Sequence, residues 1–495
     1  MLNNAKAGAA FRGLLWMVLM VAMAAQSIGQ TNVVINGMAV NGQGKRIELY
    51  AYDDMLTRAE NLLDATVIDS TREFRLETYI NYPRLVFLQI ENYSQSFYVE
   101  PGHTYEVYIA RFDWDVDEQR NIFLSPEALP LEFVNVDHDE LNLQIMRFDA
   151  AVDSFISNHR VFLDWKYRPQ KRYFDTLVQT MQVQFPDGNN EFFNRYKRYT
   201  LAGMKYAMKF ATRKQMAAHF IDGQPVRYHD ENYMRLFFDI YANSISKGMA
   251  RVPKHRLVAW VNATDERRMI DSVGLNPLMR NEQVRELAVL QALKEAYHDK
   301  DYDPQKVFMM VNTIGANSKF AEHRQIADHM KKQMRALKKG TEVPPMELPD
   351  IDHQLVNLQE MRGKWIYLSF VRVGDPNSLR EIETIAHFHD SICARNKNVE
   401  FVSVACDREF QKMHHLLRNN RRGHRYNWTW LHFDGNYRLL EHFGVVSFPT
   451  FILINPEGNF HYSVTPSPAT GILMNGPWEI KNEPADVSRP FFEHQ

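Results

Sequence analysis

The spacing of apolar residues changes twice along this chain of 495 residues, and each change restricts the fold that a segment can adopt. Residues 30–113 contain short stretches rich in β-branched and aromatic residues, separated by turn residues, which is the pattern of strands. Phe74 and Leu76 alternate with Arg75 and Glu77, so one face of this stretch is apolar. We therefore expect residues 30–113 to form a small antiparallel β domain folded as a sandwich.

From residue 114 to residue 340 the apolar residues recur at the helical period instead. The stripe formed by Leu141, Ile145 and Phe148 predicts one helix. Further helices are expected in five segments, 169–185, 190–211, 231–247, 282–298 and 304–338. No repeat of fixed length is visible, which argues against a solenoid. We expect an all-α domain over residues 114–340, and its sequence offers no motif to which a reaction can be assigned.

After residue 340, fully apolar stretches alternate with amphipathic ones. Strands are predicted over 365–371, 399–406, 428–434 and 450–460, and helices over 376–395, 408–420 and 437–443. Strands that are apolar on both faces and joined by helices predict a mainly parallel sheet with helices on both sides. We assign this α/β domain to residues 341–470. Residues 471–495 are left as a C-terminal tail whose fold the sequence does not define.

Composition and charge narrow the class of protein. A chain of 495 residues is too long for one hydrophobic core, so several domains are expected. Apolar residues make up 45% of the chain and charged residues 24%, which is ordinary for a globular protein. A formal net charge of −2 provides no electrostatic basis for binding nucleic acid, and no nucleic-acid partner is expected.

The N-terminus has the pattern of a targeting segment. Two basic residues precede the apolar run Leu14–Ala25, which is typical of a signal peptide and short for a membrane span. We predict a signal peptide over residues 1–29, with cleavage before Gln30 or, alternatively, after Ala24; an uncleaved anchor is a further alternative. No later stretch is apolar enough to span a bilayer. The mature chain is therefore expected to be exported, for example to a periplasm, without an integral membrane segment.

The α/β domain resembles a known family. The stretches GKWIYLSFVRVGDPNSLREIETI, VEFVSVACD and GVVSFPTFILINPEGNF together resemble the thioredoxin fold of the TlpA/ResA type, over residues 345–465. The resemblance implies that Pro449 follows a cis peptide bond and faces the reactive dithiol of the family. It also implies a groove at Ser447, Phe448, Pro449 and Thr450, along which active relatives align an extended polypeptide by backbone hydrogen bonds.

The preceding segments fit the same resemblance. The β domain, with FYVEPG near its end, is similar to the small β domain (DUF4369-like) that often precedes such modules in exported proteins of Bacteroidota. A helical middle segment is common in these chains. The resemblance thus implies a β domain, a helical segment and a thioredoxin-like domain in that order, which is the order that the spacing of apolar residues predicts.

The chain departs from the family at the redox centre. The four positions of the family's Cys-x-x-Cys motif are occupied in this chain by Asp375, Pro376, Asn377 and Ser378. Disulfide exchange requires an attacking thiolate, which neither a carboxylate nor a hydroxyl can replace. These residues suit a helix start instead, with Asp375 as N-cap, Pro376 at the first helical position and Ser378 adding a hydrogen bond. An acid–base or anion-binding role is the alternative, although Asp375 itself competes for the positive helix end.

The chain contains only two cysteines, Cys393 and Cys406. Cys393 lies on the predicted helix, ~27 Å from Asp375 at the usual rise per residue, and shares its apolar stripe. Cys406 ends the next parallel strand, at the opposite end of the helix, so the two sulfurs are too distant for a disulfide. Cys406 is the better candidate for a reactive thiol because it lies at the functional edge of the sheet, but we favour a buried, inert thiol.

Other candidate sites fail on spacing. His387 and His389 are two residues apart on a helix and point to different faces, and His414 and His415 diverge likewise. The basic stretch 418–425 is interpreted as a solvated loop, with an anionic partner as the alternative. The sequence predicts no metal site and no cofactor.

Three functions remain. The first, which we favour, is a redox-inactive protein that uses the groove at Ser447–Thr450 to bind a polypeptide partner. Phe448, Trp428 and Trp430 are expected to add aromatic surface, with a core position as the alternative for Trp430. The second is an enzyme, a thiol-disulfide oxidoreductase working through the single thiol of Cys406. The third is a scaffold in which the helical segment makes the important contacts. The sequence names neither the partner nor the oligomeric state.

Overall fold

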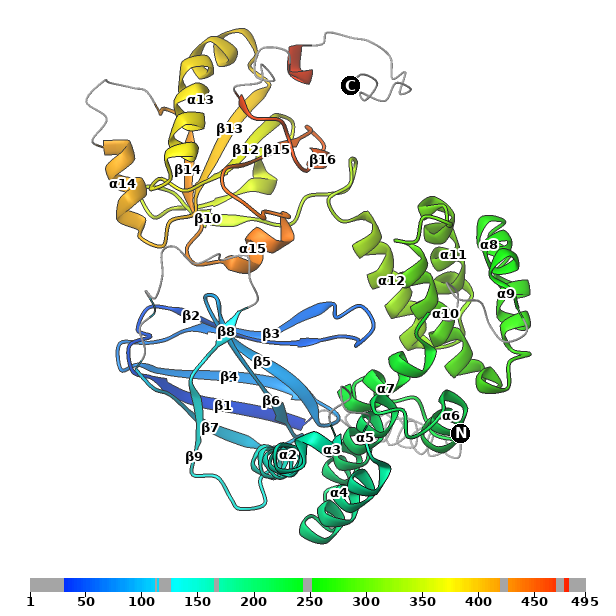
Figure 1. Cartoon of the computed structure of the whole chain (residues 1–495). Coiled ribbons are helices and arrows are strands. Elements are labelled where there is room, and N and C mark those ends of the chain that lie inside the picture. Colours follow the sequence, from blue (N-terminus) through cyan, green and yellow to red (C-terminus); the bar gives the residue numbers. More distant parts are fainter. Residues whose placement is uncertain are drawn as a thin grey trace, which may run out of the picture. The chain divides into compact units, whose positions relative to one another are not determined.

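The computed structural model describes residues 31–111, 114, 126–163, 169–243, 252–418, 426–468 and 476–479. The predicted signal peptide, most of the basic stretch 418–425 and nearly all of the C-terminal tail lie outside these residues. The described residues form two compact units, one within the ranges 1–116 and 127–334 and the other within 117–126 and 335–495 (Figure 1). In the described part of the chain, no helix combines the length and apolar character that crossing a membrane requires.

The first unit begins with two β-sheets. Their strands are β1 (Thr31–Ala39), β2 (Arg46–Tyr52), β3 (Glu60–Val67), β4 (Glu73–Ile80), β5 (Arg84–Ile90), β6 (Tyr93–Val99), β7 (Thr104–Ile109), β8 (Glu127–Ala128) and β9 (Leu131–Val134). One sheet has the order β4-β1-β7-β9 and the other β3-β2-β5-β6-β8. Side chains of both sheets, such as Ile35 and Leu76 from the first and Leu49 and Leu88 from the second, share one core. The predicted sandwich is therefore confirmed.

Two details of the sandwich differ from the prediction. The pairings β1–β7 and β6–β8 are parallel, so the sheets are mixed rather than purely antiparallel. In addition, β8 and β9 pair with β6 and β7 although they follow residue 113, where the helical domain was expected to begin. These strands of two and four residues are too short to show a period of their own.

The rest of this unit is helical. Its helices are α2 (Leu141–Asn158), α3 (Arg160–Leu163), α4 (Lys171–Gln184), α5 (Glu191–Ala207), α6 (Arg213–Phe220), α7 (Glu231–Tyr241), α8 (Lys254–Asn262), α9 (Glu266–Val273), α10 (Glu282–Ala296), α11 (Pro304–Asn317) and α12 (Ala321–Arg335). Every predicted helical segment contains a helix, and the segment 304–338 contains two. The sequence did not reveal the short helices α6, α8 and α9, which offer few turns for a periodic pattern.

The connection between β2 and β3 inserts into the helical part. Leu56 is buried in the core formed by the helices, and its carbonyl accepts a hydrogen bond from Lys294 Nζ at 2.5 Å. Asp54 Oδ2 lies 2.8 Å from His329 Nδ1 on α12. These contacts join the sandwich to the helices within one unit.

The second unit contains a five-stranded sheet with helices on both faces. Its elements are β10 (Glu347–Pro349), β11 (Leu355–Asn357), β12 (Trp365–Val371), α13 (Pro376–Arg395), β13 (Val399–Ala405), α14 (Phe410–Arg418), β14 (Thr429–His432), α15 (Tyr437–His442), β15 (Thr450–Ile454) and β16 (Phe460–Tyr462). The sheet has the order β14-β13-β12-β15-β16. One of its faces packs on Ile382 and Ile385 of α13 and on Met413 of α14, and the other face packs on Leu439 and Leu440 of α15.

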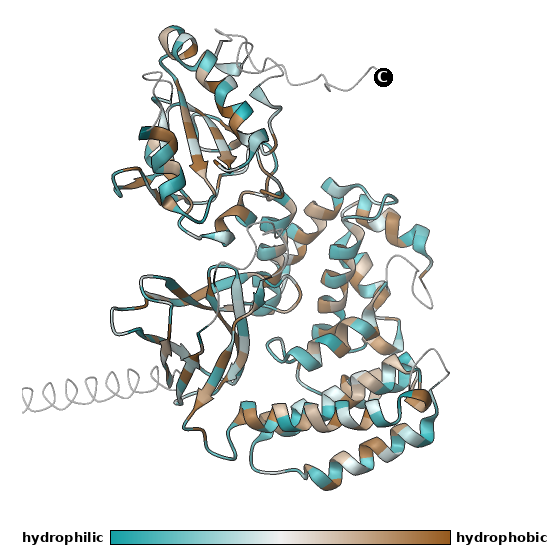
Figure 2. Cartoon of the chain, turned by 60° about the vertical axis from the view of Figure 1, so that its left-hand side comes forward, coloured by the Kyte–Doolittle hydropathy of each residue, from teal (hydrophilic) through white to brown (hydrophobic). Residues whose placement is uncertain are grey.

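The central strands β12, β13 and β15 are buried along almost their whole length, as their apolar sequences predict, and Figure 2 shows the contrast with the hydrophilic faces of the surrounding helices. Strands β12, β13 and β14 run parallel to one another. The pairings β12–β15 and β15–β16 are antiparallel, so the expected mainly parallel sheet is a mixed one. A parallel and an antiparallel strand look alike in sequence when both faces are buried.

Candidate functional site

The turn between β12 and α13 places the residues at the Cys-x-x-Cys position. Asp375 is the N-cap of α13, where its carboxylate accepts hydrogen bonds from the Ser378 backbone N–H at 2.8 Å and from the Ser378 hydroxyl at 2.9 Å. Pro376 is the first helical residue. The Ser378 hydroxyl is buried and accepts a hydrogen bond from the Arg372 N–H at 3.2 Å. The predicted capping arrangement is therefore confirmed.

Asp407 holds the same turn from the neighbouring strand. It follows β13, is buried, and accepts hydrogen bonds from the Val373 N–H at 2.6 Å and the Gly374 N–H at 3.1 Å. Sequence reasoning missed this residue. A signal was present, because parallel strands β12 and β13 end at the same edge of the sheet and a carboxylate follows one of them.

The pKa of the Asp375 carboxyl group lies below its ordinary value. Burial raises it, but hydrogen bonds from Ser378 and from the Asn377 N–H, together with the charge of Arg372, lower it by more. Asp375 is therefore an ionised hydrogen-bond acceptor at neutral pH and not a proton donor. Its carboxylate also occupies the helix N-terminus that an anion would need. These features disfavour the acid–base and the anion-binding alternatives for this turn.

Neither cysteine has the surroundings of a reactive thiol. Cys406 is fully buried, its Sγ lies 3.5 Å from the Val404 carbonyl oxygen, and burial together with the charge of Asp407 raises its pKa well above the ordinary value. Cys393 is half-buried, and burial raises its pKa also. Both are free thiols, and they pack in cores on opposite faces of the sheet. Because the thiolate is the nucleophile, raised pKa values suppress reactivity.

The loop before β15 contains the expected cis proline. The Phe448–Pro449 peptide bond is cis, and the hydroxyl of Thr450 donates a hydrogen bond to the Ser447 carbonyl at 2.6 Å. Ser447 and Val446 are exposed, and 75% of the Val446 surface is accessible, which is high for a large apolar residue. The loop thus presents an apolar side chain beside the cis peptide bond.

The turn and the cis-proline loop lie next to each other. The guanidinium carbon of Arg372 is 5.4 Å from the centre of the Phe448 ring, a distance typical of a cation–π contact. The sequence placed residues 375–378 and 447–450 in one site, and the contact between Arg372 and Phe448 brings the turn and the loop that contain them together. Arg372 was not predicted as part of it, because its contact with Phe448 joins residues far apart in the chain.

Trp428 and Trp430 do not contribute to this surface, so the expectation for Trp428 was wrong and the core alternative for Trp430 is confirmed. They are 8% and 4% exposed, and the indole N–H of Trp428 donates a hydrogen bond to Ser403 Oγ at 2.8 Å. His389 of α13 packs against the Trp428 ring. Both tryptophans belong to the core between the sheet and α13.

His432 supports Asp407 from strand β14. Its Nδ1 accepts a hydrogen bond from the Asp434 N–H at 3.1 Å, so Nε2 carries the proton and donates to the Asp407 carbonyl at 2.8 Å. Burial lowers the pKa of His432, which is therefore neutral at neutral pH. The described residues contain no group of three or more His, Cys, Asp or Glu side chains arranged to hold a metal ion.

The strand order, the helix that follows β12 and the cis-proline loop define a thioredoxin-like domain in the second unit. The family described as thioredoxin-like matches residues 363–460 of this chain. The family assignment thus covers the C-terminal part of the chain, and the resemblance of the N-terminal β domain stays a prediction. Comparison with proteins of curated function gave no match.

Solved structures of thiol-disulfide enzymes are similar to the same part. A thiol:disulfide interchange protein from Bacteroides sp. is 20% identical, with 29% of this chain and 95% of that chain covered and a TM-score of 0.25. The thioredoxin domain of a Bacteroides vulgatus thiol-disulfide oxidoreductase is 21% identical over 26% of this chain and 87% of that domain, with a TM-score of 0.23. A secreted Mycobacterium tuberculosis disulfide oxidoreductase is 17% identical, with 26% of this chain and 95% of that chain covered and a TM-score of 0.22.

Proposed function

We propose that this chain is an exported, redox-inactive thioredoxin-fold protein that binds an extended polypeptide at its cis-proline loop. One observation carries the proposal: an exposed loop containing the cis Phe448–Pro449 bond faces a turn that has no thiol. The turn uses its carboxylate and its hydroxyl for capping. Binding without redox chemistry is what such a site can still perform.

The chemistry of the loop supports a peptide as the ligand. Val446 provides an exposed apolar contact, and the neighbouring Ser447 is exposed as well. Phe448, with Arg372 over its ring, provides a flat surface that combines an aromatic group with a positive charge. An extended peptide that lies beside such a loop can gain backbone hydrogen bonds and place a side chain on each of these groups.

Export follows from the N-terminal pattern rather than from the fold. The predicted signal peptide over residues 1–29 directs the mature chain to a periplasm or a similar compartment. Partners are therefore expected among exported polypeptides. The scaffold function of the helical segment remains compatible with this proposal.

The redox part is tested by reduction of insulin disulfides with the mature chain. We expect no activity in the wild type. The double variant Asp375→Cys/Ser378→Cys, which restores the motif, serves as the gain-of-function comparison. Insulin reduction by the wild type that disappears in Cys406→Ser would establish the alternative, a single-thiol oxidoreductase.

The binding part is tested on an array of peptides from reduced and alkylated casein. Val446→Asp introduces a charge into the exposed apolar contact and is expected to weaken binding about tenfold, or about 1.4 kcal/mol. Leu355→Asp is the matched control, because Leu355 is 66% exposed on β11 and lies outside the loop. Equal binding by wild type and Val446→Asp would contradict a binding role of this loop.

A further inference from the structure

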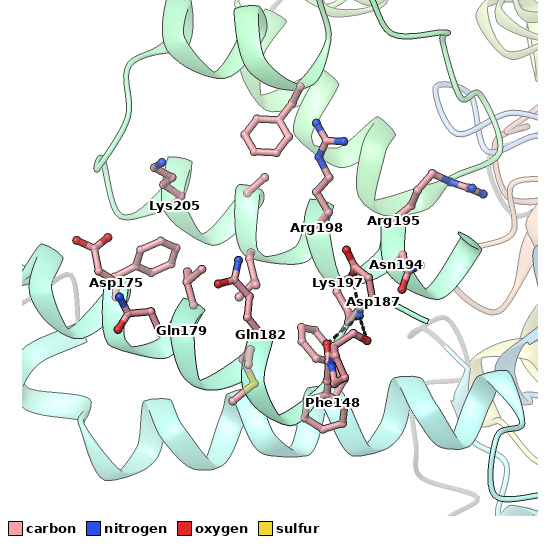
Figure 3. A pocket seen from close by; sticks show the side chains of 18 of the residues that line it. Phe148, Asp175, Gln179, Gln182, Asp187, Asn194, Arg195, Lys197, Arg198 and Lys205 are labelled. Atoms are coloured by element: carbon pink, nitrogen blue, oxygen red, sulfur yellow. Dashed lines mark hydrogen bonds and ion pairs between the residues drawn. The ribbon is translucent and has the colours of Figure 1, made fainter. Parts of the chain in front are cut away.

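A cavity of about 950 Å³ lies in the helical part of the first unit. It runs along the pair α4 and α5, with α2 beneath it and the end of α6 at its rim (Figure 3). Its size is at the upper end of the range for sites that bind small molecules. The sequence analysis assigned no chemistry to this segment, and the proposed peptide site lies in the other unit.

The floor of this α4–α5 cavity is apolar. Phe148, Phe174, Met181 and Ala202 line it although they are nearly fully buried, so the cavity reaches the core of the helices. Half-buried apolar side chains cover its walls, namely Val178, Phe185, Leu201 and Phe220. A ligand that enters this cavity must therefore present an apolar portion.

Two cations of α5 line the same cavity. Arg198 and Lys205 are seven residues apart, which places them on one face of the helix and ~10 Å apart along its axis. Figure 3 shows both side chains extending from α5 on the side of the rim. Arg198 donates a hydrogen bond to the His219 carbonyl at 3.4 Å and lies over the Phe220 ring, 5.4 Å from its centre. Among the described residues, neither cation forms an ion pair with a carboxylate.

The other charges of the cavity are already compensated. Lys197 Nζ lies 3.1 Å from Asp187 Oδ1 and also donates to the carbonyls of Phe185 and Pro186, both at 2.9 Å. The second carboxylate of the lining, Asp175, pairs with Lys171 at 2.7 Å.

Arg195, the remaining cation of the lining, turns away from the cavity. Its Nε lies 3.6 Å from Asp230, and Figure 3 shows its guanidinium pointing away from the other lining residues. Arg198 and Lys205 therefore leave the cavity with an excess of positive charge above an apolar floor.

We propose that the α4–α5 cavity binds an amphiphilic anion, an apolar chain that ends in a carboxylate. The carboxylate would contact Arg198 and Lys205, and the chain would lie against Val178 and Leu201 on the apolar floor. An uncharged apolar ligand would leave the two cations without a counter-charge. A cationic amphiphile would be repelled by them.

The probe is dodecanoate below its critical micelle concentration, titrated into the mature chain by calorimetry. Dodecanol and dodecyltrimethylammonium share its chain and differ in charge. We expect dodecanoate to bind at least tenfold more tightly than dodecanol and the cationic amphiphile not to bind. Equal affinity for dodecanoate and dodecanol, or tighter binding of the cation, would refute the proposal.

Variants locate the site. The double variant Arg198→Gln/Lys205→Gln is expected to weaken dodecanoate binding at least tenfold and to leave the affinity for dodecanol unchanged. Val178→Gln is expected to weaken the binding of both ligands. Lys300→Gln, at an exposed position outside the cavity, is the matched control and should bind as the wild type does. Unchanged binding in the double variant, with a wild-type circular dichroism spectrum as evidence of folding, would refute the site. Absence of dodecanoate binding by the wild type would refute the ligand class and would leave the peptide-binding proposal untouched.

Discussion

Replacement of Asp375 by alanine tests whether the turn at residues 375–378 acts as a structural cap of α13. The variant removes the carboxylate that accepts the backbone N–H and the hydroxyl of Ser378. Loss of an N-cap costs about 0.5–2 kcal/mol. The Ser378 hydroxyl is buried and loses its acceptor, which adds to the cost. We expect the start of α13 to be destabilised by about 2 kcal/mol, which corresponds to an opening equilibrium constant about 30-fold larger.

The assay is native-state hydrogen exchange of α13 peptides, measured by mass spectrometry on the full mature chain. A local readout is needed because a chain of two units does not unfold in one step. Asp375→Asn preserves the cap acceptor and is expected to lose only a few tenths of a kcal/mol. His387→Ala, which changes an exposed side chain on the same helix, is the matched control. Exchange in Asp375→Ala at the wild-type rate would refute the capping argument.

The lowered pKa of Asp375 predicts that the stability of the start of α13 depends on pH. Because the pKa of Asp375 is lower in the folded chain than its ordinary value of 3.8, its carboxylate stabilises the fold fully above that value. This stabilisation is lost as the pH falls through the folded-state pKa. The difference in opening free energy between wild type and Asp375→Ala should therefore shrink below about pH 4. A difference that stays constant down to pH 2 would contradict the role of the ionised carboxylate.

Three further predictions concern the cores. Cys406 should react with iodoacetamide only after denaturation, and rapid labelling of the native chain would contradict its burial. Gly37→Ala should lower the midpoint of thermal unfolding, because the added Cβ would lie 2.2 Å from the Phe74 ring, whereas Gly188→Ala meets no atom within 4 Å and should change it little. Leu56→Ala should destabilise the first unit by about 2–5 kcal/mol in urea titrations, since it opens a cavity in the helical core. A loss of stability below about 1 kcal/mol would show that the β2–β3 connection packs only loosely on the helices.

Local signals explain which elements were predicted well. The bounds of α13, residues 376–395, follow from a cap, a proline at the first helical position and a regular apolar stripe, all of which act within a few residues. Strands β12 and β13 were predicted from their short, mostly apolar sequences. The absence of cysteines at residues 375–378 can be read directly from the sequence, since the identity of these residues does not depend on the rest of the fold.

Contacts between distant residues explain what was missed. The pairing of β8 and β9 with the sandwich and the antiparallel direction of β15 depend on partners far away in the chain. Helix α10 lies within the predicted helical segment 282–298, but only the tertiary structure shows that Leu287, Ala288, Val289 and Leu290 are all buried.

The sequence by itself determined the order of the β, helical and thioredoxin-like segments and the helix cap at Asp375, because both depend on residues close together in the chain. The absence of thiols at the turn follows directly from the residues at 375–378. Only the tertiary structure decided that Asp407 holds the turn, that Arg372 lies over Phe448, that both tryptophans are buried and that Arg198 and Lys205 line an apolar cavity. Each of these depends on side chains that meet only after strands or helices distant in the chain have packed together.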